Sequence, residues 1–318
     1  MRALAFVLST PFIEFAAVLL AIIWMIRDTK DKVRPLLVIA LLVNLFYGIL
    51  LGIFMSAEGS LLPWKYDAVL WRLDAALGLP TQAMARALQG HWHAPLQTSY
   101  QLMVPLMIAW FLVVRRAGRG GALILAYVAE LLTGPLLYAI VPACGPVYAF
   151  KADWLHATPK LELMRLPEMP NAFPSLHIGT AFVLLLFAPG RWSRAVATTL
   201  FTLTAMATIA SGEHYLIDLL PGIAFGCFAA ETGLRRLRPA LAMLGLALTW
   251  SLLVRFEYVR LIAHPAALRV LAGVTVAAAA VTVSRFWRLP AAEAGSRSAD
   301  LTDAPAQPPA VHMGETVN

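Results

Sequence analysis

Long apolar runs separated by short charged loops dominate this sequence. Several of the runs reach about 18 residues or more, the length that crosses a bilayer as a helix. We therefore predict an all-α fold, a polytopic membrane helical bundle of about nine transmembrane helices. The predicted spans cover residues 4–26, 35–55, 97–114, 121–142, 174–189, 195–211, 214–231, 240–256 and 267–284.

The first run, residues 4–26, has two interpretations. It starts after a single basic residue, as a cleaved signal peptide also would, but it continues without a convincing cleavage site, so we interpret it as a retained span. Glu14 in this run and Glu130 in the fourth are costly in lipid unless they face other helices or water. Either acid has a structural hydrogen-bonding role or a functional one.

Two longer segments between the spans are less apolar. Residues 56–96 combine apolar positions at helical spacing with Trp64, Tyr66 and Trp71, which predicts amphipathic helices at the membrane interface. We interpret this segment as an interfacial connector, with a lid or lipid-entry role as the alternative. Residues 143–173 form the longest polar stretch between spans.

The composition agrees with a membrane protein. The chain is 60% hydrophobic and 14% charged, with a mean hydropathy of +0.72, whereas a soluble domain carries about 25% charged residues. The net charge of +7 requires no nucleic acid, because most basic residues fall in short loops, as they do on the cytoplasmic side of membrane proteins. Cys144 and Cys227 provide neither a zinc spacing nor a disulfide framework.

Basic residues divide unequally between the two sides that nine spans define. Fifteen of the 25 lysines and arginines fall on one side, so we predict that this side is cytoplasmic, with the N-terminus outside and the C-terminus inside. We expect the plasma (inner) membrane of a bacterium. The fifteen are Arg27, Lys30, Lys32, Arg34, Arg115, Arg116, Arg119, Arg191, Arg194, Arg235, Arg236, Arg238, Arg285, Arg288 and Arg297.

Two polar clusters lie where apolar runs begin: residues 171–177 read NAFPSLH and residues 211–218 read SGEHYLID. His214 and Asp218 are four residues apart, so on a helix they would share one face. A carboxylate that accepts the proton of one ring nitrogen makes the other nitrogen a better nucleophile or base. The predicted topology places His177 and His214 at the same outer boundary of the membrane, where one headgroup could reach both. Alternatively, each is an interfacial histidine bonded to a neighbour.

These clusters resemble the signature of the type-2 phosphatidic acid phosphatase superfamily. Residues 174–177 stand for its Pro-Ser-Gly-His element, with Leu176 in place of the glycine, and His214 and Asp218 stand for the His-x-x-x-Asp end of its last motif. The residue pattern of the two clusters is most similar to that of the inositol phosphorylceramide synthase (inositolphosphotransferase) branch of sphingolipid metabolism, whose members move a phosphoryl headgroup between lipids.

The resemblance covers roughly residues 34–232 and implies a division of the chain into four parts. Residues 1–33 would add one N-terminal transmembrane helix and a loop, and residues 34–232 would form a six-helix phosphatase or phosphotransferase core. Residues 233–288 would add two further helices. Residues 289–318, rich in Ala, Pro, Ser and Glu, predict a disordered cytoplasmic tail.

The resemblance also implies a role for each site residue. His214 would attack the donor phosphorus and form a phosphohistidine, while Asp218 orients and charges its ring. His177 would protonate the leaving alcohol and then activate the acceptor. Ser175 and the free N–H groups that begin the fifth span would bind phosphoryl oxygens, since a proline-led first helical turn attracts phosphate. The scheme implies no metal and no cofactor.

The sequence departs from the family where phosphate is bound. The Lys-x6-Arg-Pro element of the family's phosphatases is absent from residues 143–173, and so is their Ser-Arg pair upstream of the second histidine. A cation should still neutralise the phosphoryl oxygens. The candidates in this stretch are Lys151, Lys160 and Arg165.

We therefore expect a membrane lipid phosphotransferase that moves a phosphoryl headgroup of the inositol-phosphate type from a phospholipid donor to a lipid or polyol acceptor. The first alternative is a lipid phosphate phosphatase acting on phosphatidic acid or a polyprenyl pyrophosphate, with water as the acceptor. The second is a non-enzymatic transporter or scaffold with an inactive core. The polar clusters lie at the membrane surface and no internal repeat is present, unlike the midplane sites of many transporters.

Overall fold

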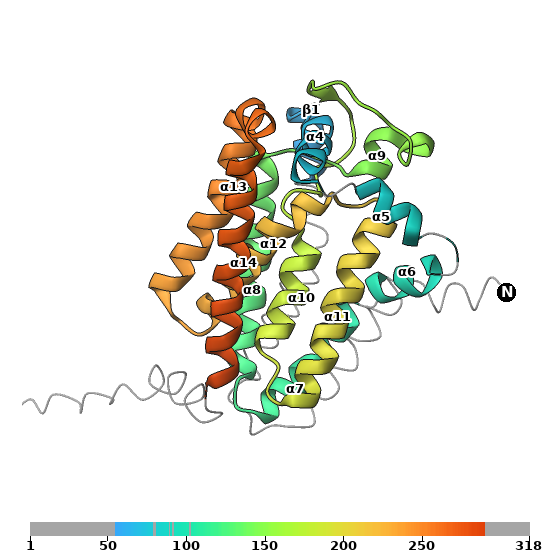
Figure 1. Ribbon diagram of the computed structural model, residues 1–318. Coiled ribbons are helices and arrows are strands. Elements are labelled where there is room, and N and C mark those ends of the chain that lie inside the picture. The colour runs from blue at the N-terminus through green and yellow to red at the C-terminus, as the bar shows by residue number, and fades with distance from the viewer. Residues whose placement is uncertain (1–54, 79–80, 89, 91, 102, 290–318) are drawn as a thin grey trace, which may run out of the picture.

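The computed structural model describes residues 55–78, 81–88, 90, 92–101 and 103–289, and these residues are mostly helical (Figure 1). The prediction of a helical fold is confirmed for these residues. Two short strands, β1 (Trp64–Lys65) and β2 (Met164–Arg165), pair antiparallel. The labelled helices are α4 (Asp67–Leu77), α5 (Thr81–Leu88), α6 (His93–Gln101), α7 (Met103–Arg116), α8 (Gly120–Ile140), α9 (Pro146–Phe150), η1 (Lys151–Asp153), α10 (Leu176–Leu186), α11 (Arg191–Ala210), α12 (Leu216–Gly233), α13 (Leu237–Ala263) and α14 (Pro265–Arg288).

Within the described ranges, four helices are long and apolar enough to cross a membrane: α8, α12, α13 and α14. They support an integral membrane protein, but the expected nine spans are not confirmed. The fifth predicted span forms α10, which is apolar but has only 11 residues. The third predicted span, residues 97–114, falls in α6 and α7, and residue 102 between them lies outside the described residues. The predicted span 4–26 with Glu14, all but the last residue of the predicted span 35–55, and the tail from residue 290 lie outside the described residues.

Helix α12 lies at the centre of the bundle. In the apolar 18-residue stretch of α12, 72% is buried, compared with 28% in the corresponding stretch of α13 and 22% in that of α14. Two glycines allow its backbone to touch that of α10: a Cβ on Gly222 would lie 2.5 Å from the Ser175 carbonyl oxygen, and one on Gly226 would lie 2.6 Å from that of Gly179. This contact sets the position of one polar cluster relative to the other.

The two helices predicted as additions to the core share its apolar packing. Trp250 and Val254 of α13 are buried in the same cluster as Tyr215 and Ile217. The indole of Trp250 also donates to the hydroxyl of Thr275 on α14 (2.9 Å), which ties α13 to α14. These helices therefore support the site as well as cover α12.

The segment predicted to hold amphipathic helices does form helices, α4 and α5. Figure 1 shows α4, α9 and β1 together at one end of the bundle, where α11 ends and α12 begins. The location of this end at the membrane interface remains a prediction. The contacts made by α4 nevertheless place it directly beside the two polar clusters, as described below.

Candidate active site

His214 lies in the turn between α11 and α12, two residues before α12 begins. Its backbone N–H donates to the carbonyl oxygen of Thr208 at the end of α11 (3.2 Å). Its side chain is 2% exposed, and ring atom Nδ1 lies 2.8 Å from the carbonyl oxygen of Ala172. The second cluster is thus hydrogen-bonded to the first, although they are about 40 residues apart in sequence.

The Ala172 carbonyl determines which ring nitrogen of His214 carries the proton. A carbonyl oxygen only accepts hydrogen bonds, so Nδ1 is protonated and Nε2 keeps its lone pair. Burial lowers the pKa of His214 to about 4, although the Ala172 bond and the charge of Glu213 act in the opposite direction. His214 is therefore a neutral imidazole near pH 7, with Nε2 available as a nucleophile.

Asp218 is fully buried in the first turn of α12. Its Oδ2 accepts from the backbone N–H of Tyr215 (2.8 Å) and lies 3.5 Å from Nδ1 of His214. The sequence predicted a His–Asp pair on one helical face, but α12 starts only at Leu216, so His214 precedes the helix. At 3.5 Å, Asp218 makes no hydrogen bond with the ring, and the shorter bond to Ala172 orients it.

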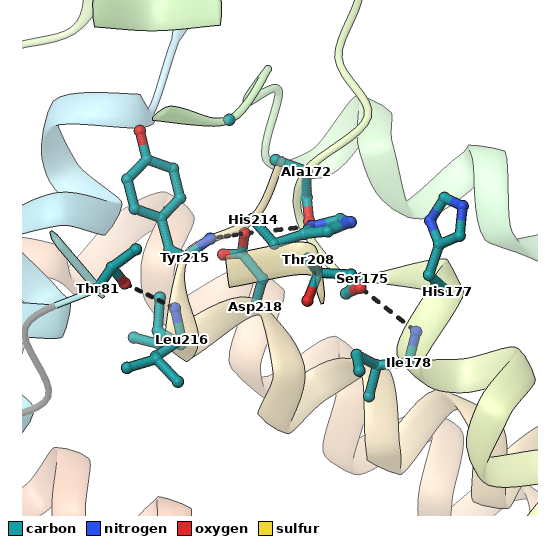
Figure 2. Close-up of polar contacts among 12 residues, drawn as sticks. Thr81, Ala172, Ser175, His177, Ile178, Thr208, His214, Tyr215, Leu216 and Asp218 are labelled. Carbon is teal, nitrogen blue, oxygen red and sulfur yellow. Dashed lines mark hydrogen bonds and ion pairs between the residues drawn. The ribbon is translucent and has the colours of Figure 1, made fainter. Parts of the chain in front are cut away.

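His177 is the second residue of α10, and Tyr100 of α6 holds its ring. The two rings stack with centroids 4.2 Å apart, and the Tyr100 hydroxyl lies 3.1 Å from Nδ1 of His177. The imidazole centroids of His177 and His214 are 6.0 Å apart. Figure 2 shows the ring of His214 extending toward His177 from a different element. The structure thus brings together the two histidines that the sequence predicted as a pair.

Ser175 caps the N-terminus of α10. Its hydroxyl accepts from the N–H of Ile178 (3.4 Å), and its own N–H donates to the carbonyl oxygen of Asp218 (3.1 Å) (Figure 2). The N–H groups of Leu176 and His177 have no acceptor within the described ranges. The first turn of α10 therefore retains two free donors beside the His177 ring.

Helix α12 differs from α10, because side chains of α4 and α5 occupy its N-terminal donors. Asp74 accepts from the N–H groups of Leu216 (3.1 Å) and Ile217 (2.7 Å) and from the Thr81 hydroxyl. Burial raises the pKa of Asp74 to about 8, against the opposing effect of these donors. The first turn of α12 is therefore closed to a ligand, and that of α10 is open.

Asp67 joins α4 to the loop before α9 and to the residue after His214. Its carboxylate accepts from the N–H of Gly145 (2.8 Å), the N–H of Cys144 and the hydroxyl of Tyr215 (3.0 Å). The sequence predicts Asp67 and Asp74 only as members of the interfacial segment, residues 56–96. The available signal was their seven-residue spacing, which puts two acids on one face of a partly apolar helix.

The three predicted phosphate-binding cations lie on the exposed surface of the loop after α9. The amine of Lys151 is 4.0 Å from Glu168, and Arg165 lies in β2. Among the described residues, no hydrogen bond or ion pair joins Lys151, Lys160 or Arg165 to either histidine. Their contact with phosphate stays a prediction.

Glu130 is buried in α8, and its Oε1 accepts from the hydroxyl of Thr180 on α10 (2.8 Å). This bond supports the structural interpretation of the acid. Over the described part of the chain, no group of three or more His, Cys, Asp or Glu side chains has the arrangement of a metal site.

Comparison with known proteins identifies a family. Residues 68–232, more than half of the 318-residue chain, match the model of the PAP2 superfamily. No curated protein and no solved structure gives a significant match. The superfamily comprises phosphatases and phosphotransferases, so the match supports an enzyme of this general kind and lipid substrates in a bilayer.

Proposed function

The chain belongs to the PAP2 superfamily, and on this premise we propose that it transfers a phosphoryl headgroup between lipids through a phosphohistidine intermediate. The observation that carries the proposal is the pair of imidazoles, 6.0 Å apart, each with Nδ1 engaged by a different partner. His214 donates from Nδ1 to a carbonyl, whereas Nδ1 of His177 faces a hydroxyl, which can accept from a protonated ring or donate to a neutral one. The two rings are thereby suited to opposite roles.

In the first step, Nε2 of His214 attacks the donor phosphorus and the bond from phosphorus to the leaving alcohol oxygen breaks. The anionic phosphate of the donor would favour the imidazolium form of His177, whose Nδ1–H can donate to the Tyr100 hydroxyl oxygen. The alcohol takes the proton from Nε2 of this imidazolium, which leaves a neutral His177 ring. The phosphorylated ring keeps its Nδ1 proton and carries positive charge. The Ala172 carbonyl at 2.8 Å and the Asp218 carboxylate at 3.5 Å stabilise that charge.

In the second step, Nε2 of His177 accepts the proton of an acceptor hydroxyl, whose oxygen attacks phosphorus while the P–N bond breaks. This returns both histidines to their starting forms. The free N–H groups of Leu176 and His177 would bind phosphoryl oxygens during both steps. Lys151, Lys160 and Arg165 remain the candidate cations, because the loop that carries them leads directly into residues 171–177.

The acceptor decides whether the enzyme is a transferase or a phosphatase. We favour a lipid hydroxyl, with a phospholipid such as phosphatidylinositol as donor and ceramide as acceptor, so that diacylglycerol is the alcohol that leaves. His214 is 2% exposed, and its neighbours Phe173 and Tyr215 are fully buried. Exclusion of water from the phosphohistidine disfavours hydrolysis relative to transfer. The inositol headgroup rests only on the resemblance of residues 171–177 and 214–218 to the synthase branch.

The test uses purified protein in detergent and phosphatidylinositol or phosphatidic acid labelled in the phosphate. Half of the samples receive ceramide or diacylglycerol. His214→Ala is compared with His156→Ala, which removes an exposed histidine from the loop after η1. We expect the label to move to the acceptor in the wild-type protein and in His156→Ala. Loss of the nucleophile in His214→Ala should reduce the rate by roughly 10⁴-fold or more.

Each other outcome identifies an alternative. Label released as free phosphate regardless of acceptor would make the protein a lipid phosphate phosphatase. Equal rates in His214→Ala and His156→Ala would refute the phosphohistidine. Absence of turnover with every donor, in a folded protein, would favour the inactive core of a transporter or scaffold.

A further inference from the structure

Arginine side chains gather at the end of the bundle opposite the histidines. Figure 1 shows the lower ends of α7, α8, α11 and α14 together at that end. Arg119 precedes α8, Arg194 lies in the first turn of α11, and Arg236 follows α12. The charges of Arg194 and Arg236 both act on Arg119. These three residues are called the arginine cluster below.

Arg119 is the buried member of the arginine cluster, with 3% of its surface exposed. Its Nη2 donates to the carbonyl oxygen of Leu289, but Nε and Nη1 have no hydrogen-bond partner within the described residues. Burial lowers the pKa of this guanidinium, and its two arginine neighbours add to the effect. Buried donors without an acceptor on a charged group are rare because each is costly.

One acid in the described structure pairs with the arginine cluster. The buried Glu231 of α12 lies 3.8 Å from Arg236 and 3.9 Å from Arg285, and neither of its carboxylate oxygens accepts a hydrogen bond. Arg194 donates to the carbonyl of Trp287 (2.6 Å) and not to an acid. One carboxylate thus serves two arginines, and among the described residues no acid is paired with Arg119 or Arg194, which leaves an excess of positive charge.

We propose that the arginine cluster binds the phosphate of an anionic membrane lipid. A phosphate could accept from one of the free donors of Arg119, Nε or Nη1, and from the guanidinium groups beside it. It would also offset the repulsion among Arg119, Arg194 and Arg236. Basic pockets between membrane helices are known to bind such headgroups. The proposal is independent of the function assigned to the histidines.

A lipid is favoured over free phosphate because the same end of the bundle carries exposed apolar side chains. Trp192 and Val196 of α11 are 74% and 50% exposed, on the face of the helix away from Arg194. A tryptophan at this position suits the headgroup region, and an exposed valine one turn further along the helix suits acyl chains. A free phosphate would use the arginines but not this apolar surface.

The test measures thermal unfolding and retained lipid for the full chain, purified in an uncharged detergent. Short-chain phosphatidylglycerol, phosphatidylcholine and inorganic phosphate are titrated separately. Arg119→Gln is compared with Arg191→Gln, which removes an exposed charge from the same end of the bundle. Arg236→Gln provides a second change within the arginine cluster. Native mass spectrometry counts the phosphatidylglycerol molecules that stay bound.

We expect phosphatidylglycerol to raise the Tm of the wild-type protein and of Arg191→Gln in a saturable way, with no rise from phosphatidylcholine. The apparent affinity should weaken roughly tenfold in Arg119→Gln and Arg236→Gln, with loss of one retained lipid. If inorganic phosphate alone saturates the effect, the anion site stands and its ligand is free phosphate. If all variants respond like the wild type, or none retains the lipid, the proposal is wrong. Lipid bound at the histidines would be unaffected by Arg119→Gln, so this result is separable from the proposed function.

Discussion

The two ends of the bundle differ in how their buried titratable groups are hydrogen-bonded. At the histidine end, Asp67 and Asp74 are buried, and each accepts at least three hydrogen bonds from α12, its preceding turn or neighbouring loops. The buried cation there, Lys65, donates to the carbonyl of Leu62 (2.6 Å). At the other end, Arg119 is equally buried and has two guanidinium nitrogens without a partner.

The difference indicates what each end does. Hydrogen bonds to Asp67 and Asp74 fix the residues that follow His214, although Oδ1 of Asp218 accepts none within the described residues. A nucleophile held in position is what a reaction at phosphorus requires. A buried cation with free donors fixes less, but it is ready to pair with an anion. We therefore assign chemistry to the histidine end and ligand binding to the arginine end.

The largest stability effect is expected from removing the acceptor that holds the histidine end together. Asp67→Ala leaves the N–H groups of Cys144 and Gly145 and the Tyr215 hydroxyl without their acceptor. We expect the free energy of unfolding to fall by about 3 kcal/mol or more. Asp153→Ala, which removes an exposed acid, should change it by less than about 0.5 kcal/mol. Denaturant unfolding in detergent measures both, and similar values would contradict the assigned role of Asp67.

The contact between α10 and α12 gives the next effect. In Gly222→Ala, the new Cβ would lie 2.5 Å from the Ser175 carbonyl oxygen, so we expect a loss of about 1–3 kcal/mol and a displaced His177. The matched control is Gly245→Ala on α13, where no atom lies within 4 Å of the added Cβ. There the higher helix propensity of alanine should add about 0.5–1 kcal/mol. Transfer activity should fall only in Gly222→Ala.

The bond from Tyr100 to His177 predicts a smaller effect on rate. Tyr100→Phe keeps the stacked ring but removes the hydroxyl that lies 3.1 Å from Nδ1. We expect kcat to fall about tenfold with little change in KM or Tm, because the tautomer of His177 is no longer selected. The limb of the pH–kcat profile that reports His177 should also move. Tyr258→Phe on α13 is the control, and an unchanged profile in Tyr100→Phe would exclude a positioning role.

The smallest expected effect is in the response of activity to acid. Burial lowers the pKa of His214 to about 4 from the ordinary 6.5, so Nε2 stays unprotonated as the pH falls from 8 to 5, and no loss of nucleophile occurs there. The unfolded chain binds this proton first, so the free energy of unfolding falls as the pH drops from about 6.5 toward 4. Rates and unfolding curves over pH 4–8 test both statements. If the rate instead falls below pH 6.5 because His214 becomes protonated, the ring has its ordinary pKa and is solvated, which contradicts the prediction.

Much of the histidine site was predictable because its chemistry is local in sequence. The residues around His177 and around His214 each carry a motif within eight positions, and the apolar runs predicted helices at α8, α12, α13 and α14. The residues that hold the histidines were not predictable in this way. Tyr100, Ala172 and Asp67 contact them or their neighbours from 42 to 148 positions away in sequence.

The sequence alone therefore determined the class of protein, the helical fold and the identity of the paired histidines, because hydropathy and motif spacing are properties of the chain. Only the tertiary structure decided which ring nitrogen of His214 is free, which helix N-terminus remains open, and that Arg119 is buried with unpaired donors. These features depend on contacts between distant segments. A hydrogen bond or a missing partner exists only after those segments have packed together.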